Sequence, residues 1–291
     1  MEIAVISGKG GTGKSSISAA LASITNKVVL ADCDVDAANL FILFNPKNYE
    51  EHKFIGGQYA ILNKDLCTNC GYCIDSCNFN AITFINKEIN ISEVLCDGCL
   101  LCSRICPEKA IKIIDNDDSR MFAGKFRYGE MVYGLLAPGE ENSGKLVNFV
   151  REKAREIAKK HKIDDIIIDG PPGIGCPVIS TIIGVDHVLI VTEPTMTGLH
   201  DLKRTIETVN KFKLNKSVFV NKYNINLGIF KHIESYCYQN KTNISGKLPY
   251  DDEIIKAMVN LKTISEWLPK SELTDEIKLT FNKIKNLIKQ K

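Results

Sequence analysis

The sequence has no long apolar segment and no large excess of charge of either sign. No uninterrupted apolar run approaches the ~18 residues of a membrane-spanning helix, and no signal peptide precedes the first strand-like segment. The 37 basic and 35 acidic residues leave a net charge of +2, which gives no sign of nucleic acid or a membrane surface as a partner. None of the five histidines belongs to a ligand pair. We therefore expect a cytoplasmic protein without a membrane span.

Cysteine is the residue type that stands out, with eleven in the chain. In a cytoplasmic protein so many cysteines are read as metal ligands before they are read as disulfides. Eight of them lie between about Gly57 and Ile114, where four cysteines recur after a shift of 29 positions. Two copies of one unit predict a small pseudo-symmetric domain. The two sets are Cys67, Cys70, Cys73 and Cys77, followed by Cys96, Cys99, Cys102 and Cys106.

On both sides of this segment, short apolar runs alternate with helical stretches. This pattern predicts an α/β fold with a mostly parallel, doubly wound sheet. Because strands of the pattern lie before and after the cysteines, we expect a small domain at 59–114, inserted into a larger one formed by 1–58 and 115–291. The expected strands are 3–7, 28–32, 166–169, 188–192 and 218–221, and the expected helices include 15–24, 146–161, 198–212 and 273–288.

Residues 8–15 read Gly-Lys-Gly-Gly-Thr-Gly-Lys-Ser and fit the phosphate-loop pattern G-x-x-x-x-G-K-[ST]. They follow an expected strand and begin an expected helix. This context favours a phosphate loop over the alternative interpretation, a chance glycine-rich turn. Inward-facing backbone N–H groups and the helix dipole suit ATP phosphates, with Lys14 on the β/γ-phosphates and Ser15 on Mg²⁺. The predicted nucleotide-binding residues here are Gly8, Lys9, Gly10, Gly11, Thr12, Gly13, Lys14, Ser15 and Ser16.

Lys9 adds a second lysine near the start of this loop. The motif resembles that of the deviant Walker-A ATPases, which include nitrogenase iron protein, MinD, ParA and the Mrp-type iron–sulfur carriers. The resemblance implies that Lys9 is catalytic together with Lys14. It also implies that Lys9 reaches across a nucleotide-sandwich dimer, so that ATP binding forms a homodimer or a heterodimer with a paralogue. The alternative is a solvated loop lysine.

Two aspartates at strand ends match further family positions. Asp34 matches the residue that orients or activates the attacking water, and Asp169, in Asp-Gly-Pro-Pro-Gly, resembles the one that binds magnesium through water. The resemblance also implies that the Gly173 N–H senses the γ-phosphate. A carboxylate at the carboxyl end of a strand beside the phosphate loop is well placed for such tasks. Asp32 and Asp36 are weaker candidates, and the alternative for any of these carboxylates is a helix cap, as for Asp36.

The resemblance also suggests residues for the adenine. Asn221 ends the fifth expected strand, where relatives hold adenine with an asparagine amide, and the loop of Pro249 and Asp251 resembles their adenine-flanking loop. Asparagine and proline at strand ends are commonly turn residues, which is the alternative.

Each cysteine set reads C-x2-C-x2-C-x3-C, the spacing of bacterial [4Fe-4S] ferredoxins. Three thiolates of one tight loop reach one cluster, and the fourth reaches the other cluster. Zinc would favour two C-x2-C pairs about 15–20 residues apart. Pro107 completes the usual C-P ending, whereas the first set has Asn78 there. The predicted ligand sets are Cys67, Cys70, Cys73 and Cys106 for one cluster, and Cys77, Cys96, Cys99 and Cys102 for the other.

Together the two parts resemble MinD-superfamily P-loop ATPases with an inserted α+β ferredoxin-like domain. Residues 139–146 and 169–176 look like signatures of that group. The resemblance implies ATP, Mg²⁺ and two [4Fe-4S] clusters as cofactors, and ATP hydrolysis that gates electron transfer to a redox partner protein. Two alternatives stay open: an Mrp-like carrier or assembly scaffold for clusters, and a redox-sensing regulatory ATPase like MinD or ParA.

Two remaining features receive simpler interpretations. Cys176 lies seven residues after Asp169, at the spacing of a cluster-ligating cysteine in nitrogenase iron protein, so a pair across a dimer axis is a hypothetical bridging metal site. Because the chain offers no clear second ligand, a small buried apolar residue is the favoured interpretation. Residues 151–156 are interpreted as a solvated helix face.

Overall fold

A computed structural model describes residues 1–25, 27–138, 140 and 143–289. Its main feature is a nine-stranded sheet in the order β13-β12-β11-β1-β10-β2-β9-β8-β3. The strands from β13 to β9 pair in parallel, and β8 and β3 add antiparallel pairings at one edge. The large, mostly parallel sheet is thus confirmed. Its strands are β1 Glu2–Ser7, β2 Val28–Asp32, β3 Lys47–Phe54, β8 Ser119–Phe126, β9 Gly129–Leu135, β10 Asp165–Pro172, β11 His187–Thr192, β12 Lys216–Val220 and β13 Asn243–Lys247.

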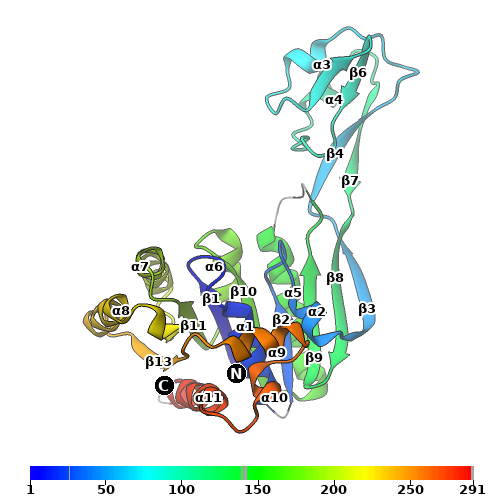
Figure 1. Cartoon of the computed structure of the whole chain (residues 1–291). Helices are drawn as coiled ribbons and strands as arrows, with labels where there is room; N and C mark the ends of the chain where they lie inside the picture. Colours follow the sequence, from blue (N-terminus) through cyan, green and yellow to red (C-terminus); the bar gives the residue numbers. More distant parts are fainter. Residues whose placement is uncertain (26, 139, 141–142, 290–291) are drawn as a thin grey trace.

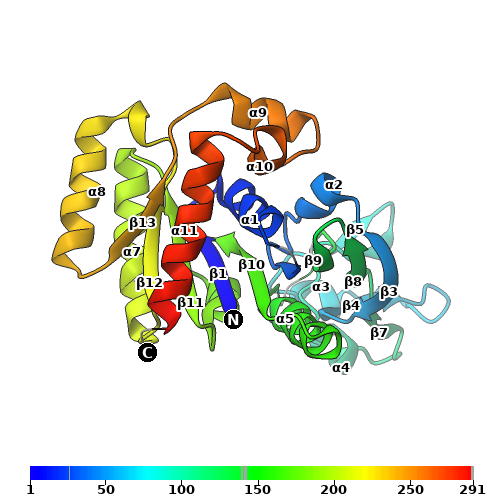
Figure 2. The same cartoon turned by 90° about the horizontal axis from the view of Figure 1, so that it is seen from below.

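Helices cover both faces of this sheet, as the view from below in Figure 2 shows. One apolar cluster joins the sheet to α5, α6, α7 and α8, and a second joins its other face to α1, α2, α10 and α11. In the described part of the chain no helix is long and apolar enough to cross a membrane. The helices are α1 Lys14–Ser23, α2 Leu40–Phe44, α5 Ser143–His161, α6 Cys176–Ile182, α7 Met196–Lys211, η1 Tyr223–Ile225, α8 Leu227–Gln239, α9 Asp252–Val259, α10 Ile264–Trp267 and α11 Glu272–Lys289.

The central strands form because both of their faces are apolar. Every residue of β1, β2 and β11 is buried, as expected of parallel strands that lie between two helical layers. At the end of the chain, Ile277, Phe281 and Ile284 recur at helical spacing and are buried against the sheet. The amphipathic helix predicted over 273–288 is therefore α11, which packs on α1 and β13.

The interpretation of 151–156 as a solvated helix face is wrong at its first residue. Arg151 is only 3% exposed, and its guanidinium lies 2.7 Å from the Glu2 carboxylate and also donates to the Ile183 carbonyl. Arg155 contacts the same carboxylate at 2.7 Å. A charge-rich stretch looks solvated in the sequence because its partner, Glu2, lies about 150 residues away. Buried charges persist where they are paired in this way.

The cysteine-rich segment leaves the sheet between β3 and β8. Its first and last strands, β4 and β7, pair antiparallel, and β5 pairs with β6. Figure 1 shows the β4–β7 ribbon continuing β3 and β8 away from the large sheet and carrying the rest of the segment at its outer end. The elements are β4 Gly57–Leu62, α3 Tyr72–Asp75, β5 Ile82–Ile85, β6 Glu88–Ile91, α4 Leu101–Ile105 and β7 Ile111–Asn116.

The two halves of this segment have similar backbones. Helices α3 and α4 begin 29 positions apart, like the cysteines before them. Residues with positive φ recur at the same interval, and two of them are glycines, whose lack of a Cβ suits this conformation. The sequence repeat is therefore a repeat of local structure. The positive-φ pairs are Asn69 and Gly98, Gly71 and Leu100, and Asn80 and Lys109.

Candidate functional site

The glycine-rich loop lies between β1 and α1, at the carboxyl edge of the parallel strands. Two of its glycines sit against other parts of the chain. A Cβ on Gly8 would lie 2.6 Å from the Cβ of Asp201, and one on Gly13, at φ +87°, would lie 2.2 Å from the amide nitrogen of Asn221. The hydroxyl of Thr12 is buried without a hydrogen-bond partner among the described residues. An unpartnered buried hydroxyl in such a loop fits a phosphate ligand.

Lys14 and Ser15 meet the end of β10 at Asp169. The Asp169 carboxylate accepts hydrogen bonds from Lys14 at 2.9 Å, from the Ser15 hydroxyl at 2.7 Å and from the Ser18 hydroxyl at 2.6 Å. The ammonium of Lys14 also lies 3.4 Å from Asp34. Four predicted residues thus share one cluster, in which Lys14 and Asp169 are buried and Ser15 and Asp34 are partly buried. Ser18 was not predicted, although its place one helical turn after Lys14 is the signal that points to it.

The charges of this cluster shift one another's pKa values. Burial alone would lower the pKa of Lys14, but Asp169 and Asp34 outweigh it and the pKa is raised. Burial raises the pKa of Asp34, although Lys14 opposes that shift. Burial, followed by the charge of Asp169, raises the pKa of Asp32 to about 7. The site therefore holds a lysine that stays charged and carboxyl groups that take up protons more readily than usual.

Asp32 shapes the loop after β2. Its buried carboxylate accepts hydrogen bonds from the backbone N–H groups of Asp34, Asn39 and Leu40 at 3.2, 3.2 and 3.1 Å. These bonds fix the course of residues 33–39, with Asp34 at the Lys14 ammonium. The helix-cap interpretation of Asp36 is wrong, because α2 begins only at Leu40 with Asn39 before it.

Gly173 follows β10 and has φ +96°. Its N–H, predicted to sense the γ-phosphate, donates to the carbonyl of Ser7 at 2.8 Å. Contact with a phosphate would require this bond to open. Of the two proposed signatures, 139–146 lies partly outside the described residues, which include only 140 and 143–146 of it.

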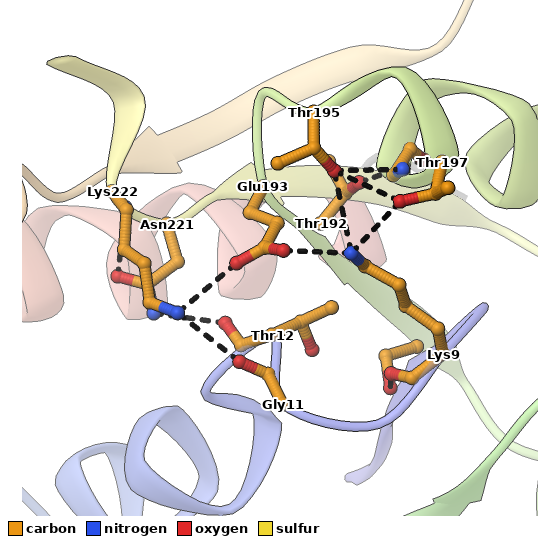
Figure 3. A network of polar contacts seen from close by, with 11 residues as sticks. Lys9, Gly11, Thr12, Thr192, Glu193, Thr195, Thr197, Asn221 and Lys222 are labelled. Atoms are coloured by element: carbon orange, nitrogen blue, oxygen red, sulfur yellow. Dashed lines mark hydrogen bonds and ion pairs between the residues drawn. The ribbon is translucent and has the colours of Figure 1, made fainter. Parts of the chain in front are cut away.

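Lys9 points back into its own chain, toward the junction of β11 and α7 (Figure 3). Its ammonium lies 2.7 Å from Glu193 and donates to the hydroxyls of Thr195 and Thr197 at 3.3 and 3.1 Å. Glu193 also pairs with Lys222 at 3.0 Å. Sequence reasoning missed Glu193 and Lys222, since a single charge after a strand has no distinctive spacing.

An apolar pocket lies beside α1, and its lining includes Ser16, which follows the phosphate-loop motif. Of the predicted adenine residues, Asn221 lines it, whereas Pro249 and Asp251 do not. Asp251 instead caps α9, accepting from the Glu253 N–H at 2.8 Å. The lining residues are Ser16, Ile17, Ala19, Leu43, Asn221, Leu248, Ile254, Met258, Lys262, Thr263 and Ile264.

The eight repeated cysteines line two separate pockets in the segment beyond the ribbon. Each pocket contains four cysteines, three from one half of the repeat and one from the other. The structure thus groups the thiols into the same two sets that the spacing predicts. One pocket has Cys67, Cys70, Cys73 and Cys106 in its lining, and the other has Cys77, Cys96, Cys99 and Cys102.

The surroundings of these thiols are apolar, and equivalent thiols are equally exposed. Cys73 and Cys102 are buried, and Cys70 and Cys99 are exposed. Burial raises the pKa of the Cys102 thiol to about 11. All eleven cysteines of the chain are free thiols. No group of three or more histidine, cysteine, aspartate or glutamate side chains among the described residues could hold a single metal ion. A cubane differs because each thiolate binds a different iron.

Three cysteines lie outside these pockets. Cys33 and Cys237 are buried, and burial raises the pKa of each, that of Cys237 to about 12. Cys176 is exposed at the start of α6. The favoured interpretation of Cys176 as a buried apolar residue is therefore wrong, because α6 begins directly after the loop at the end of β10 and leaves this thiol open.

A buried lysine, a serine and an aspartate around a glycine-rich turn that joins the first strand to the first helix define a P-loop nucleotide-binding protein. Residues 3–264 match the CobQ/CobB/MinD/ParA nucleotide binding domain. The chain belongs to this family, whose MinD and ParA members are nucleotide-binding ATPases.

Similar proteins cover almost the whole chain. Two uncharacterized proteins of Methanocaldococcus jannaschii are 36% and 31% identical over 291 and 260 residues, covering 99% and 88% of this chain and 98% and 88% of their own lengths. The septum site-determining protein MinD of Pyrococcus horikoshii, solved with Mg-ADP, has a TM-score of 0.57 at 17% identity, over 98% of this chain and 96% of that one. This likeness shows the fold.

A partial similarity links the chain to a ferredoxin. An uncharacterized ferredoxin of Methanocaldococcus jannaschii is 25% identical over 111 residues, which cover 38% of this chain and 63% of that protein.

Proposed function

We propose that this chain is an ATP-hydrolysing iron–sulfur protein in which the nucleotide state controls electron transfer through two [4Fe-4S] clusters to a partner protein. The observation that carries the proposal is the presence, in one chain, of two pockets with four cysteines each and a complete phosphate-loop site. A protein needing only nucleotide hydrolysis has no use for eight thiols in two matched sets. The partial similarity to a ferredoxin supports the same conclusion.

The residues around the phosphate loop divide the work of hydrolysis. Lys14 leaves Asp169 for the phosphates of ATP, because they carry more negative charge than one carboxylate. Ser15 and Asp169 are then free to hold Mg²⁺, directly and through water. Asp34 orients the attacking water, and burial, which raises its pKa, makes its carboxylate a better proton acceptor than an exposed aspartate. Bound magnesium supplies charge stabilisation at the phosphates.

The adenine end of the nucleotide is assigned to the pocket beside α1. Ser16 and Asn221 belong to its lining, and Asn221 also holds the Thr12 carbonyl at 2.9 Å. We do not assign adenine contacts to Pro249 and Asp251, which lie outside the lining.

The cysteine segment, 57–116, is proposed as the two-cluster module. The clusters, when bound, supply one-electron carriers. The chain's residues would hold the clusters in apolar surroundings. Backbone N–H groups also donate to two of the cysteine sulfurs, that of Ala60 to Cys96 at 3.4 Å and that of Ala110 to Cys106 at 3.3 Å. Hydrogen bonds to sulfur and burial are the means by which proteins set cluster potentials.

Hydrogen bonds connect the nucleotide site with the ribbon that carries this module. Val35, next to Asp34, accepts from the Leu136 N–H at 2.9 Å. The following N–H, of Ala137, donates at 2.9 Å to the hydroxyl of Ser119, the first residue of β8. Movement of Asp34 on nucleotide binding is therefore transmitted by two bonds to the base of the ribbon. This short path supports control of the module by the nucleotide.

We further propose that ATP joins two subunits, with Lys9 of each at the nucleotide of the other. Two similar proteins in one archaeon support a paralogous partner as an alternative to a second copy. Purification without oxygen, followed by iron and zinc analysis and phosphate-release assays, tests the proposal. We expect roughly eight irons per chain and ATP turnover in the same preparation. Zinc in place of iron would contradict it.

A regulatory ATPase of the MinD type is the second candidate, favoured by the family and by the likeness to MinD. In that case the clusters report redox state and pass no electrons to a partner. ATP-dependent binding to liposomes, with no effect of ATP on electron transfer, would favour this function.

A further inference from the structure

Glu193 joins two lysines from different sides of the phosphate loop (Figure 3). One carboxylate oxygen lies 2.7 Å from the Lys9 ammonium and the other 3.0 Å from that of Lys222. Glu193 directly follows β11, which pairs with β1 up to the residue before the loop. Lys222 also donates to the Gly11 carbonyl at 3.2 Å. One carboxylate thus ties the first lysine of the loop to its own subunit.

We infer that Glu193 is a positioning residue that retains Lys9 in its own subunit and sets how much ATP is needed to release it. This inference rests on the proposed function, in which Lys9 serves the nucleotide of a second subunit. An ammonium in contact with Glu193, Thr195 and Thr197 has to leave all three before it can cross a dimer. Every ATP-driven association therefore competes with this contact.

The strength of the contact suits a restraint that ATP can overcome. Burial alone would raise the pKa of Glu193, but Lys9 and Lys222 outweigh burial and the pKa is lowered, so the carboxylate is charged at neutral pH. The side chains of Lys9 and Glu193 are 28% and 12% exposed, so water weakens the pair. The phosphates of ATP carry several negative charges, and ADP, with one phosphate fewer, competes less well for the lysine.

Lys222 lowers the free-energy cost of releasing Lys9 from Glu193. When Lys9 leaves, Glu193 keeps its contact with Lys222, so no part-buried carboxylate is left without a cation. Lys222 in turn remains on the Gly11 carbonyl and keeps the loop in place. After Lys9 has left, Glu193 and Lys222 therefore still have each other as partners.

The test compares wild type and Glu193→Gln by sedimentation velocity, titrating Mg²⁺ with a non-hydrolysable ATP analogue. Glutamine keeps the shape and loses the charge, and two Lys9 contacts break per dimer. We expect the analogue concentration for half-dimerisation to fall by about five-fold or more, with ADP affinity unchanged. Glu193→Asp keeps the charge, so its analogue concentration for half-dimerisation should lie between those of wild type and Glu193→Gln. Glu88→Gln makes the same chemical change at a more exposed lysine–glutamate contact, that of Glu88 with Lys64 in the cysteine-rich segment, and should not change dimerisation.

Each other outcome has a definite meaning. If wild type dimerises and Glu193→Gln dimerises at the same concentration, this inference is overturned while the proposed function stands. If Glu193→Gln needs more analogue than wild type to dimerise and binds ADP more weakly, Glu193 supports the loop and does not restrain Lys9. That result would also overturn the inference. If wild type forms no dimer with the analogue, alone or with a paralogue, both the inference and the proposed ATP-driven association are wrong.

Discussion

The hydroxyl of Ser15 donates a hydrogen bond to the carboxylate of Asp169 across 2.7 Å, although 154 positions separate them in the chain. The same carboxylate holds the Lys14 ammonium at 2.9 Å. The ammonium of Lys14 and the carboxylate of Asp169 therefore neutralise each other within the phosphate-loop site. In the proposed mechanism, nucleotide binding would exchange this internal ion pair for one with phosphate, and Asp169 would then serve metal-dependent hydrolysis.

Asp169→Asn should slow ATP turnover by at least about 100-fold, because the carboxamide cannot hold magnesium through water as a carboxylate does. Phosphate release measures the effect. Asp165→Asn, at the other end of β10, is the matched control, since the Asp165 carboxylate pairs with Lys285 at 3.0 Å and lies away from the loop. Equal turnover in wild type and Asp169→Asn would contradict the assignment.

Pairs of cysteine substitutions test which thiols share a cluster. Cys106→Ser should remove roughly four irons per chain, and Cys70→Ser/Cys106→Ser should remove no more, since both thiols line one pocket. Cys77→Ser/Cys106→Ser should remove roughly eight, because Cys77 lines the other pocket. Anaerobic iron analysis distinguishes these results. Additive iron loss in the first pair would mean that each half of the repeat holds its own cluster.

The exposed Cys176 should be the thiol that a maleimide labels fastest in the cluster-loaded protein. The other two cysteines outside the pockets, Cys33 and Cys237, are buried and their pKa values are raised, so they should react slowly. Cys176→Ala should abolish the fast labelling and leave iron at roughly eight per chain. An iron content lower than that of wild type in this variant would instead support a third, bridging metal centre.

Much of this architecture follows from sequence patterns. The apolar runs predict β1, β2, β10, β11 and β12, and the cysteine spacing predicts the two sets that line the pockets. Both signals are local and repeat. The antiparallel edge of β8 and β3 could not be predicted, since β3 has no buried residue and β8 is only partly buried, so neither strand has a continuous apolar run. Contacts such as Lys9 with Glu193 could not be predicted either, because 184 positions separate these residues and nothing in their spacing marks the pair.

Ser119→Ala should uncouple the ribbon from the nucleotide site. It removes the acceptor of the Ala137 N–H and a donor to Glu140, at a cost of about 1–3 kcal/mol in the free energy of unfolding. ATP turnover should change by less than about two-fold, since no described hydrogen bond joins Ser119 to a predicted nucleotide-binding residue, but the effect of ATP on the EPR spectrum should shrink. Ser271→Ala, which removes hydrogen bonds at the start of α11, is the control. A full ATP effect in Ser119→Ala would exclude this path.

Glu266 should make the free energy of unfolding depend on pH in the acid range. Burial alone would raise its pKa, but hydrogen bonds from Arg127, Thr263 and Tyr128 outweigh burial and lower it to about 2. A lowered carboxyl pKa stabilises the folded state fully above the ordinary value of 4.5, and the contribution is lost as the pH falls from there toward 2. Wild type should exceed Glu266→Gln by about 2–3 kcal/mol in free energy of unfolding at pH 7.

That difference should narrow by most of its value when urea unfolding is repeated near pH 2.5. A gap that is constant with pH would show that the Glu266 carboxylate is not preferentially stabilised in the fold. Comparing two proteins at each pH removes the shared acid sensitivity of the remaining carboxyl groups.

The midpoint potentials of the iron–sulfur centres, measured by anaerobic EPR titration with Mg·ATP and with Mg·ADP, test the proposed coupling most directly. We predict that ATP moves at least one midpoint by on the order of 40–130 mV, which corresponds to a coupling free energy of about 1–3 kcal/mol for one electron. Lys14→Met should show no shift, since it loses the phosphate contact. Identical potentials and identical electron-transfer rates with both nucleotides would show that the two sites in this chain act independently.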